Sequence, residues 1–386
     1  MSSGDPKTKL LVPVCTLFLM AGCAGLHVER AMKIAQADWV TYGGAPSRTN
    51  QASTEAVPPF VEMWQHNTVA GILATPLVRD SVIILATLNG EIQTVNLLNG
   101  KRTSYAGFDA PIAGTPVWNG SNIFVPISSS NHSIVSVSLR NSERFWSVAL
   151  GPIESSPLLL GKQLYVTTLE GKAHCLNADD GSEIWQFKTW QGNDRKPIRS
   201  SPASDGETVF FGCDDGAVYA LGAKEGNLRW RFETKGSLFA TPIVFESKVV
   251  VGSLDGFVYC LRSETGELIW SFDTKSVIYG SASTSGKKVF VGTADGKCYA
   301  LDVTTGFPVW SASTKSGINT APLVAGNTIY VGSLDRTLRV LDAESGKDMW
   351  QYSAPGRIKV SPVFWRNTLL VISEDRLLIA FTPEKK

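Results

Sequence analysis

The fold of this chain is decided by the stretch Thr241-Pro-Ile-Val-Phe-Glu-Ser-Lys-Val-Val-Val-Gly-Ser-Leu-Asp-Gly-Phe-Val-Tyr-Cys-Leu-Arg-Ser-Glu-Thr-Gly-Glu-Leu-Ile-Trp270. Two short runs rich in β-branched and aromatic residues lie on either side of Asp255-Gly256. Such a pair predicts a β-hairpin, because glycine accepts the positive φ that the tight turn requires. Thr265-Gly266 marks a second turn before the run that carries Trp270. The stretch therefore predicts a small antiparallel sheet of short strands.

The same unit recurs along the chain at a nearly constant step. The slot of Pro242 is filled by Pro76, Pro116, Pro157, Pro202, Pro242, Ala282, Pro322 and Pro362, which lie 40, 41, 45, 40, 40, 40 and 40 positions apart. The slot of Trp270 is filled by Trp64, Tyr105, Trp146, Trp185, Trp230, Trp270, Trp310 and Trp350. A four-stranded unit with a period of about 40 residues is typical of a β-propeller. Residues 38–382 are therefore predicted to form an all-β, eight-bladed β-propeller of four-stranded antiparallel blades.

The two ends of the repeat region are expected to close the ring. Trp64 precedes the first proline, whereas the last unit ends at Phe381 with no Trp run after it. The segment from Phe60 to Trp64 is therefore predicted to pair into the last blade as its missing outer strand. This pairing would join the two ends of the chain.

Most residues that could suggest chemistry fall into repeat slots. The aspartates that precede turn glycines are expected to bond local backbone, and the Trp series is expected to pack between adjacent blades. Four cysteines occupy slots for small side chains and are expected to be buried free thiols, with a disulfide as the alternative in an oxidising compartment: Cys175, Cys213, Cys260 and Cys298. No metal-ligand spacing, Gly-x-Ser-x-Gly, phosphate loop or dinucleotide fingerprint occurs. The sequence thus predicts no catalytic residue, metal site or cofactor.

The N-terminus has the layout of a signal peptide. Lys7 and Lys9 precede an apolar run that ends at Met20 and is too short to span a bilayer. The following Ala-Gly-Cys23 resembles the lipobox of bacterial lipoproteins, which implies cleavage after residue 22 and a lipid such as palmitate on Cys23. Because Ala24 rather than Asp follows, the anchor is expected in the outer membrane, facing the periplasm. Residues 23–37 are predicted to be a flexible tether. The alternative to a lipoprotein signal is an ordinary secretory signal cleaved near the same place.

The balance of charged residues argues against one class of partner, and the breaks in the repeat indicate where a partner is expected to bind. The chain has 36 basic and 35 acidic residues without a basic cluster, so nucleic acid is not expected to bind. Function is expected where the repeat breaks. The second unit has Ser128 to Asn131 in place of the Asp-Gly turn, and the longest step adds a loop from Trp190 to Arg199.

The repeat resembles that of the PQQ-like (quinoprotein-type) β-propeller family. The resemblance rests on Thr293-Ala-Asp-Gly-Lys-Cys-Tyr-Ala-Leu-Asp302, on Thr305-Gly306 and Trp310, and on the lead-in from Asp38 to Asn50. It covers residues 38 to about 382 and implies the propeller fold. It says less about function, because one fold serves many functions.

Two branches of this family imply different functions. Quinoprotein dehydrogenases bind pyrroloquinoline quinone and Ca²⁺, but this chain lacks their adjacent cysteines and extra loops. The BamB family implies a non-enzymatic, monomeric propeller within an outer-membrane assembly complex, which binds the platform BamA and nascent outer-membrane proteins. Its docking loop implies partner contacts by Arg195, Ile198 and Arg199, although Leu238 and Ala240 replace the acidic pair of that family. For the loop, the alternative is a tolerated surface insertion. For the function, the alternative is another envelope partner, such as a polysaccharide.

Overall fold

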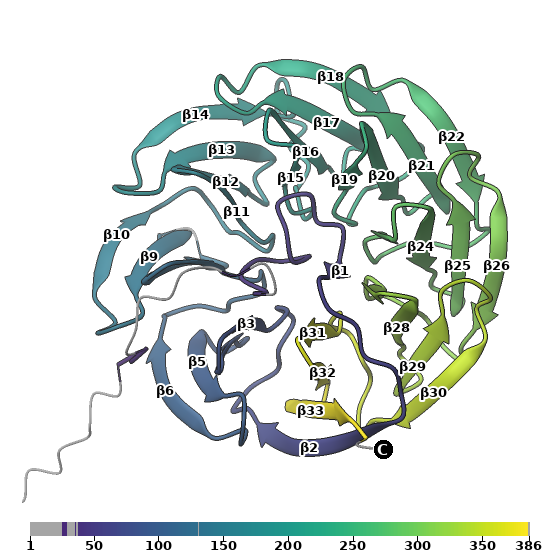
Figure 1. Cartoon of the computed structure of the whole chain (residues 1–386). Coiled ribbons are helices and arrows are strands. Elements are labelled where there is room, and N and C mark those ends of the chain that lie inside the picture. The colour runs from purple at the N-terminus through teal and green to yellow at the C-terminus, as the bar shows by residue number, and fades with distance from the viewer. Residues whose placement is uncertain (1–24, 29–34, 36–37, 130, 385–386) are drawn as a thin grey trace, which may run out of the picture.

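Each copy of the repeat folds into one small antiparallel sheet, and the sheets stand as blades around a central axis (Figure 1). The computed structural model describes residues 25–28, 35, 38–129 and 131–384. Among these residues the strands form eight sheets, and every regular element is a β-strand. The predicted all-β, eight-bladed propeller is confirmed. No helix in the described part of the chain could cross a membrane.

Within a blade the strands follow one another outward from the axis. Blade 1 contains β3 (Leu77–Arg79), β4 (Val82–Ala86), β5 (Glu91–Asn96) and β6 (Arg102–Gly107), and blade 2 contains β7 (Val117–Asn119), β8 (Asn122–Pro126), β9 (Ile134–Ser138) and β10 (Arg144–Val148). Blade 3 contains β11 (Leu158–Leu160), β12 (Gln163–Thr167), β13 (Lys172–Asn177) and β14 (Glu183–Lys188), and blade 4 contains β15 (Ala203–Ser204), β16 (Thr208–Gly212), β17 (Ala217–Gly222) and β18 (Leu228–Glu233). Blade 5 contains β19 (Ile243–Phe245), β20 (Lys248–Gly252), β21 (Phe257–Arg262) and β22 (Leu268–Asp273). Blade 6 contains β23 (Ser283–Thr284), β24 (Lys288–Gly292), β25 (Lys297–Asp302) and β26 (Pro308–Ser313), and blade 7 contains β27 (Leu323–Ala325), β28 (Thr328–Gly332), β29 (Thr337–Asp342) and β30 (Asp348–Ser353).

Blade 8 is built from both ends of the repeat region. It contains β31 (Val363–Trp365), β32 (Thr368–Ser373), β33 (Leu377–Pro383) and, as its outer strand, β2 (Phe60–Asn67). β2 pairs antiparallel with β33, from Phe60 opposite Pro383 to Asn67 opposite Leu377. The predicted closure of the ring is confirmed.

The tryptophan slot joins neighbouring blades, as predicted. Trp270 of blade 5 donates its indole Nε1–H to the carbonyl of Val303 in blade 6 at 2.9 Å. A Cβ on Gly306 of blade 6 would lie 2.6 Å from the Trp270 ring, so this slot requires glycine. The same donor bond recurs from Trp64, Trp146, Trp185, Trp230 and Trp310.

The aspartates before the turn glycines have the local role predicted for them. Asp255 Oδ1 accepts the backbone N–H of Phe257 at 2.9 Å, and Gly256 has φ +88°. Asp215 accepts the N–H of Ala217 in the same way. These carboxylates hold turns.

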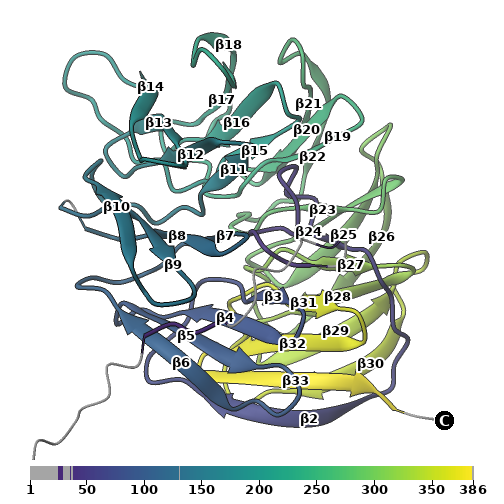
Figure 2. The same cartoon turned by 60° about the vertical axis from the view of Figure 1, so that its left-hand side comes forward.

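Residues 38–52, here called the axial segment, lie across the centre of the ring (Figures 1 and 2). Their backbone bonds the innermost strands of six blades, including a two-way pair between Trp39 and Val78. The short strand β1 (Gln51–Ala52) pairs parallel with β27. Arg48 reaches blade 3 by donating to the carbonyl of Pro157, and Asp38 accepts from the indole of Trp365 in blade 8. One segment thus ties all eight blades together.

Arg48 is the centre of this segment and is fully buried among carbonyl and hydroxyl groups. Its guanidinium donates to the carbonyls of Pro157, Pro202 and Tyr42 and to the hydroxyl of Thr41. Burial lowers the pKa of Arg48 to about 9, so the side chain remains charged at neutral pH. The four acceptors compensate the loss of water around the cation.

Part of the predicted flexible tether is packed on the propeller. Leu26 and Val28 are buried in the same apolar cluster as Trp118 and Ile123 of blade 2. The backbone N–H of Val28 donates to the carbonyl of Leu139 at 2.8 Å. The tether prediction needs correction here, because two apolar side chains find a buried position. Cys23 lies outside the described residues, as does the predicted signal peptide.

Candidate functional site at the funnel rim

The loops between blades repeat a five-residue pattern that ends at the proline slot. The residue before the slot is Ser or Thr in seven of the eight units, and its hydroxyl bonds the neighbouring loop. The recurring bond runs from backbone N–H to hydroxyl: Thr75 to Thr115, Thr115 to Ser156, Ser156 to Ser201, Ser201 to Thr241, Thr241 to Ser281 and Ala321 to Ser361. We call this set, with Ala321 as its one non-hydroxyl member, the hydroxyl ring.

The residue four positions before the slot is equally regular. It is Ile in seven units and Leu in one: Ile72, Ile112, Ile153, Ile198, Leu238, Ile278, Ile318 and Ile358. All eight are buried. In blade 5 a Cβ on Gly252 would lie 2.4 Å from Cγ2 of Ile278, so this glycine makes room for the isoleucine. The slot anchors each loop in the core.

Between these two uniform positions lies the most variable one. The residue three positions before the slot is of a different type in every unit: Leu73, Ala113, Glu154, Arg199, Phe239, Tyr279, Asn319 and Lys359. All eight line a solvent-open hollow of roughly 180 Å³ on the axis, whose lining also includes Tyr42 of the axial segment and members of the hydroxyl ring. We call these eight residues the funnel rim, and the side of the ring that carries them the funnel face.

The rim combines cations with two aromatic rings, of which Tyr279 is exposed and Phe239 is half-buried. Arg199 forms an ion pair with Asp214 and lies 3.7 Å from a carboxylate oxygen of Glu154. Its guanidinium also lies over the ring of Phe239, 5.1 Å from the centroid. Phe239 is in turn 6.3 Å from Tyr279, which is 42% exposed. One side of the rim therefore combines an arginine, paired with two carboxylates, with two aromatic rings, and is suited to polar and aromatic contacts with a partner.

The enlarged loop stands beside this surface, between blades 3 and 4. Trp190 donates its indole N–H to the carbonyl of Glu170, and the guanidinium of Arg195 lies over its ring at 4.7 Å. Asp194, Arg195 and Lys196 are exposed at the tip. Lys196 pairs with Asp194, and the exposed Arg195 stacked on Trp190 lies beside the arginine and aromatic side of the rim.

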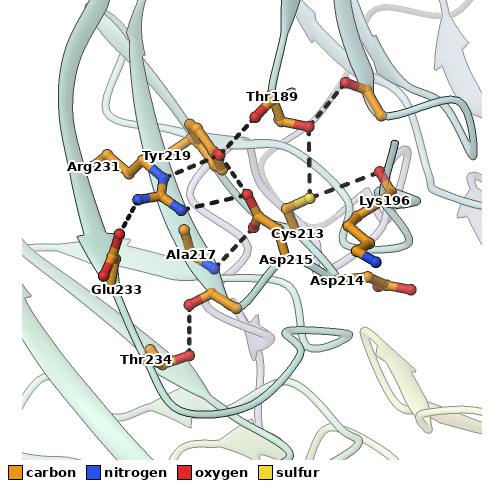
Figure 3. A network of polar contacts seen from close by, with 12 residues as sticks. Thr189, Lys196, Cys213, Asp214, Asp215, Ala217, Tyr219, Arg231, Glu233 and Thr234 are labelled. Atoms are coloured by element: carbon orange, nitrogen blue, oxygen red, sulfur yellow. Dashed lines mark hydrogen bonds and ion pairs between the residues drawn. The ribbon is translucent and has the colours of Figure 1, made fainter. Parts of the chain in front are cut away.

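A polar network holds the base of this loop (Figure 3). The Tyr219 hydroxyl bonds the Thr189 carbonyl and the carboxylate of Asp215. The thiol of Cys213 lies 3.7 Å from the Thr189 hydroxyl and 3.5 Å from the carbonyl of Pro197. Burial raises the pKa of Cys213 to about 12, so this thiol is a weak hydrogen-bond donor and a poor nucleophile. Like Cys175, Cys260 and Cys298, it is free and buried, as predicted.

The predicted docking residues have different surroundings. Arg195 is exposed at the loop tip, and Arg199 is a half-buried member of the funnel rim. Ile198 is wholly buried, and its backbone N–H donates to the Thr168 carbonyl. The prediction that Ile198 contacts a partner is therefore corrected, because this side chain fills the uniform isoleucine slot. Alignment of the units backward from each proline would have identified that slot.

The same alignment would have identified the rim residues that the sequence analysis missed. Glu154, Phe239, Tyr279, Asn319 and Lys359 occupy one column of the repeat, and diversity in an otherwise regular repeat was the available signal.

The lining of the funnel does not fit the Ca²⁺ of the dehydrogenase branch. Ca²⁺ takes about six to eight oxygen ligands, commonly from several carboxylates. No group of three or more His, Cys, Asp or Glu side chains in the described part of the chain could hold a metal ion. Glu154 is the one carboxylate among the described lining residues, and it lies beside Arg199.

The fold is that of a PQQ-like β-propeller, and its shape resembles that of BamB. The family model described as "Beta-alanine-activating enzyme, beta-propeller" matches residues 118–328, and the chain belongs to this β-propeller family. An uncharacterized protein of Rickettsia conorii is 25% identical over 166 residues, which cover 38% of this chain and 39% of the relative.

Solved structures share the architecture. BamB from Moraxella catarrhalis matches with a TM-score of 0.72 and 19% identity, over 84% of this chain and all of that one. A quinohemoprotein alcohol dehydrogenase from Pseudomonas putida matches with a TM-score of 0.79 and 12% identity, over 94% of this chain and 83% of that one. Because both identities are low, these similarities show the fold alone.

Proposed function

We propose that this protein is a non-enzymatic lipoprotein scaffold of the outer-membrane β-barrel assembly machinery, anchored through a lipid on Cys23. Its funnel face binds a BamA-type platform protein, and Arg195 and Arg199 contribute the contacts. The observation that carries the proposal is the enlarged loop, which presents a stacked arginine beside a rim that already contains Arg199 and two aromatic rings. Interface hot spots are rich in arginine and aromatic residues. The similarity in shape to BamB supports this function by analogy.

Recovery of the platform protein from cross-linked envelopes tests the docking surface. Arg195→Ala combined with Arg199→Ala is expected to reduce recovery about tenfold or more, because truncation of a hot-spot arginine costs about 2 kcal/mol. Arg366→Ala is the matched control, because Arg366 also stacks on a tryptophan, Trp365 at 4.3 Å, in a turn between the first two strands of blade 8. Equal recovery with both variants would show that the loop is only a tolerated insertion.

The lipid and the enzyme alternative have separate tests. Metabolic labelling with a lipid precursor is expected to mark the wild-type chain and not Cys23→Ala. A dye-linked dehydrogenase assay with added pyrroloquinoline quinone and Ca²⁺ is expected to give no turnover above background. Quinone-dependent turnover would contradict the scaffold function.

A further inference from the structure

The segment Gly25–Val28 is clamped between two blades at the outer edge of the ring (Figure 1). The backbone N–H of His27 donates to the hydroxyl of Ser104 on β6, at 3.1 Å. The N–H of Leu26 donates to the hydroxyl of Ser142, in the turn between β9 and β10. Leu26 is fully buried and Val28 is 6% exposed. The clamp thus combines backbone bonds to blades 1 and 2 with two buried apolar side chains.

The clamp restricts where a lipid on Cys23 can be. A Cβ on Gly25 would lie 3.2 Å from the hydroxyl oxygen of Ser142, so the chain leaves the ring beside this turn. Cys23 is two residues earlier, and two extended residues span about 7 Å. The turn that contains Ser142 lies on the side opposite the funnel face, because the turns between third and fourth strands and the loops between blades are at opposite ends of the outer strands.

We propose that this clamp orients the propeller on the bilayer. The edge formed by the turns 97–101 of blade 1 and 139–143 of blade 2 rests on the lipid surface, and the funnel face points away from the membrane. This inference depends on the lipid anchor proposed above. It explains how a ring anchored by one residue can keep its docking surface accessible to a partner.

The chemistry of this edge suits a bilayer surface with anionic headgroups. Leu98 is 72% exposed at the tip of the blade 1 turn, and the exposed charged residues of the two turns are Lys101, Arg140 and Glu143, with a net positive charge. Basic and apolar side chains are favourable at such a surface. The equivalent turns of blades 3 and 5 are acidic, with Asp179 and Asp180 and with Glu264 and Glu267, whereas those of blades 4 and 7 each carry one Lys and one Glu and that of blade 6 is uncharged. An anionic surface therefore attracts the clamped edge and repels the turns of blades 3 and 5.

Fluorescence quenching by spin-labelled lipids tests the orientation. The full lipoprotein, purified from membranes, is inserted into vesicles of phosphatidylethanolamine and phosphatidylglycerol. Single reporters are attached at Asn141→Cys, Glu264→Cys or Asp194→Cys; the four native thiols are buried and do not compete for the label. Quenching is expected to be several-fold stronger at position 141 than at 264 or 194. Leu26→Asp with Val28→Asp is expected to remove the difference between positions 141 and 264, whereas Leu26→Met retains it.

The outcomes separate the two proposals. Chains that float with the vesicles but show equal quenching at all three positions would overturn the orientation while leaving the lipid anchor intact. A double Asp variant that floats and keeps the wild-type pattern would also overturn it, because the clamp would then have no orienting role. Wild-type chains that do not float would overturn the lipid anchor, and the orientation with it.

Discussion

The hydroxyl ring and the funnel rim are two residues apart in every interblade loop, yet the repeat treats them in opposite ways. Seven of the eight units place Ser or Thr in the hydroxyl ring, whereas no two units share a residue type in the rim. In blade 6, Ser281 is buried and accepts the N–H of Thr241 from the neighbouring loop. Tyr279 instead faces the solvent-open funnel.

Structural residues and candidate recognition residues thus occupy different positions of the same repeat. A side chain that bonds the next blade must be of one kind in every unit, because the same bond recurs around the ring. A side chain that faces the funnel has no repeated partner and is free to vary. The rim is therefore the position where eight units can each add a different contact to one binding surface.

Deletion of residues 59–66 is expected to have the largest effect, because it abolishes the ring on which both positions depend. β2 supplies the outer strand of blade 8, and Trp64 carries the bond to blade 1 at 2.8 Å. The deletion exposes the edge of β33 and is expected to cause loss of cooperative unfolding in thermal denaturation followed by circular dichroism. An unchanged melting temperature would contradict the role of β2 in closure.

Trp270→Ala is expected to destabilise the ring by about 3–5 kcal/mol, because a buried aromatic ring is replaced by a cavity between two blades. Urea denaturation measures the loss. Trp190→Ala is the control, since this half-buried indole lies outside the repeat slot and packs on a loop. A similar loss for both variants would contradict the special role of the repeat slot.

These two predictions rest on features that the sequence alone could supply. The blades, the ring closure and the tryptophan packing are predicted from a pattern that occurs eight times, so an irregular unit can be interpreted by comparison with the others. The axial segment occurs once, and its contacts depend on backbone and side-chain groups brought together from all eight blades. Nothing in the sequence near Arg48 predicts that the carbonyls of Pro157 and Pro202 surround its guanidinium. The docking hypothesis is wrong at Ile198, because the last residues of the long loop keep the repeat spacing from Pro202 and Ile198 fills the buried isoleucine slot.

The hydroxyl ring is expected to contribute less per residue. Ser361→Ala removes the acceptor of the Ala321 N–H at 2.9 Å and is expected to cost about 1 kcal/mol. Ala321→Ser supplies the missing hydroxyl opposite Ser281 and is expected to raise the free energy of unfolding by up to about 1 kcal/mol. Urea titrations of both variants measure the two changes. Changes of opposite sign in the free energy of unfolding would support the role of the hydroxyl ring. A lower free energy of unfolding for Ala321→Ser would show that the missing hydroxyl at this position has another role.

Tyr279→Ala is expected to have the smallest effect on stability, within about 0.5 kcal/mol, because a side chain that is 42% exposed leaves no buried cavity. Its neighbour provides the matched comparison. Ile278 is fully buried against Gly252, and Ile278→Ala is expected to cost about 2–5 kcal/mol. Urea midpoints of the two variants compare adjacent residues of the same loop, so any difference comes from the slot and not from the loop. Equal losses would place the rim among the structural positions and remove the basis for assigning recognition to it.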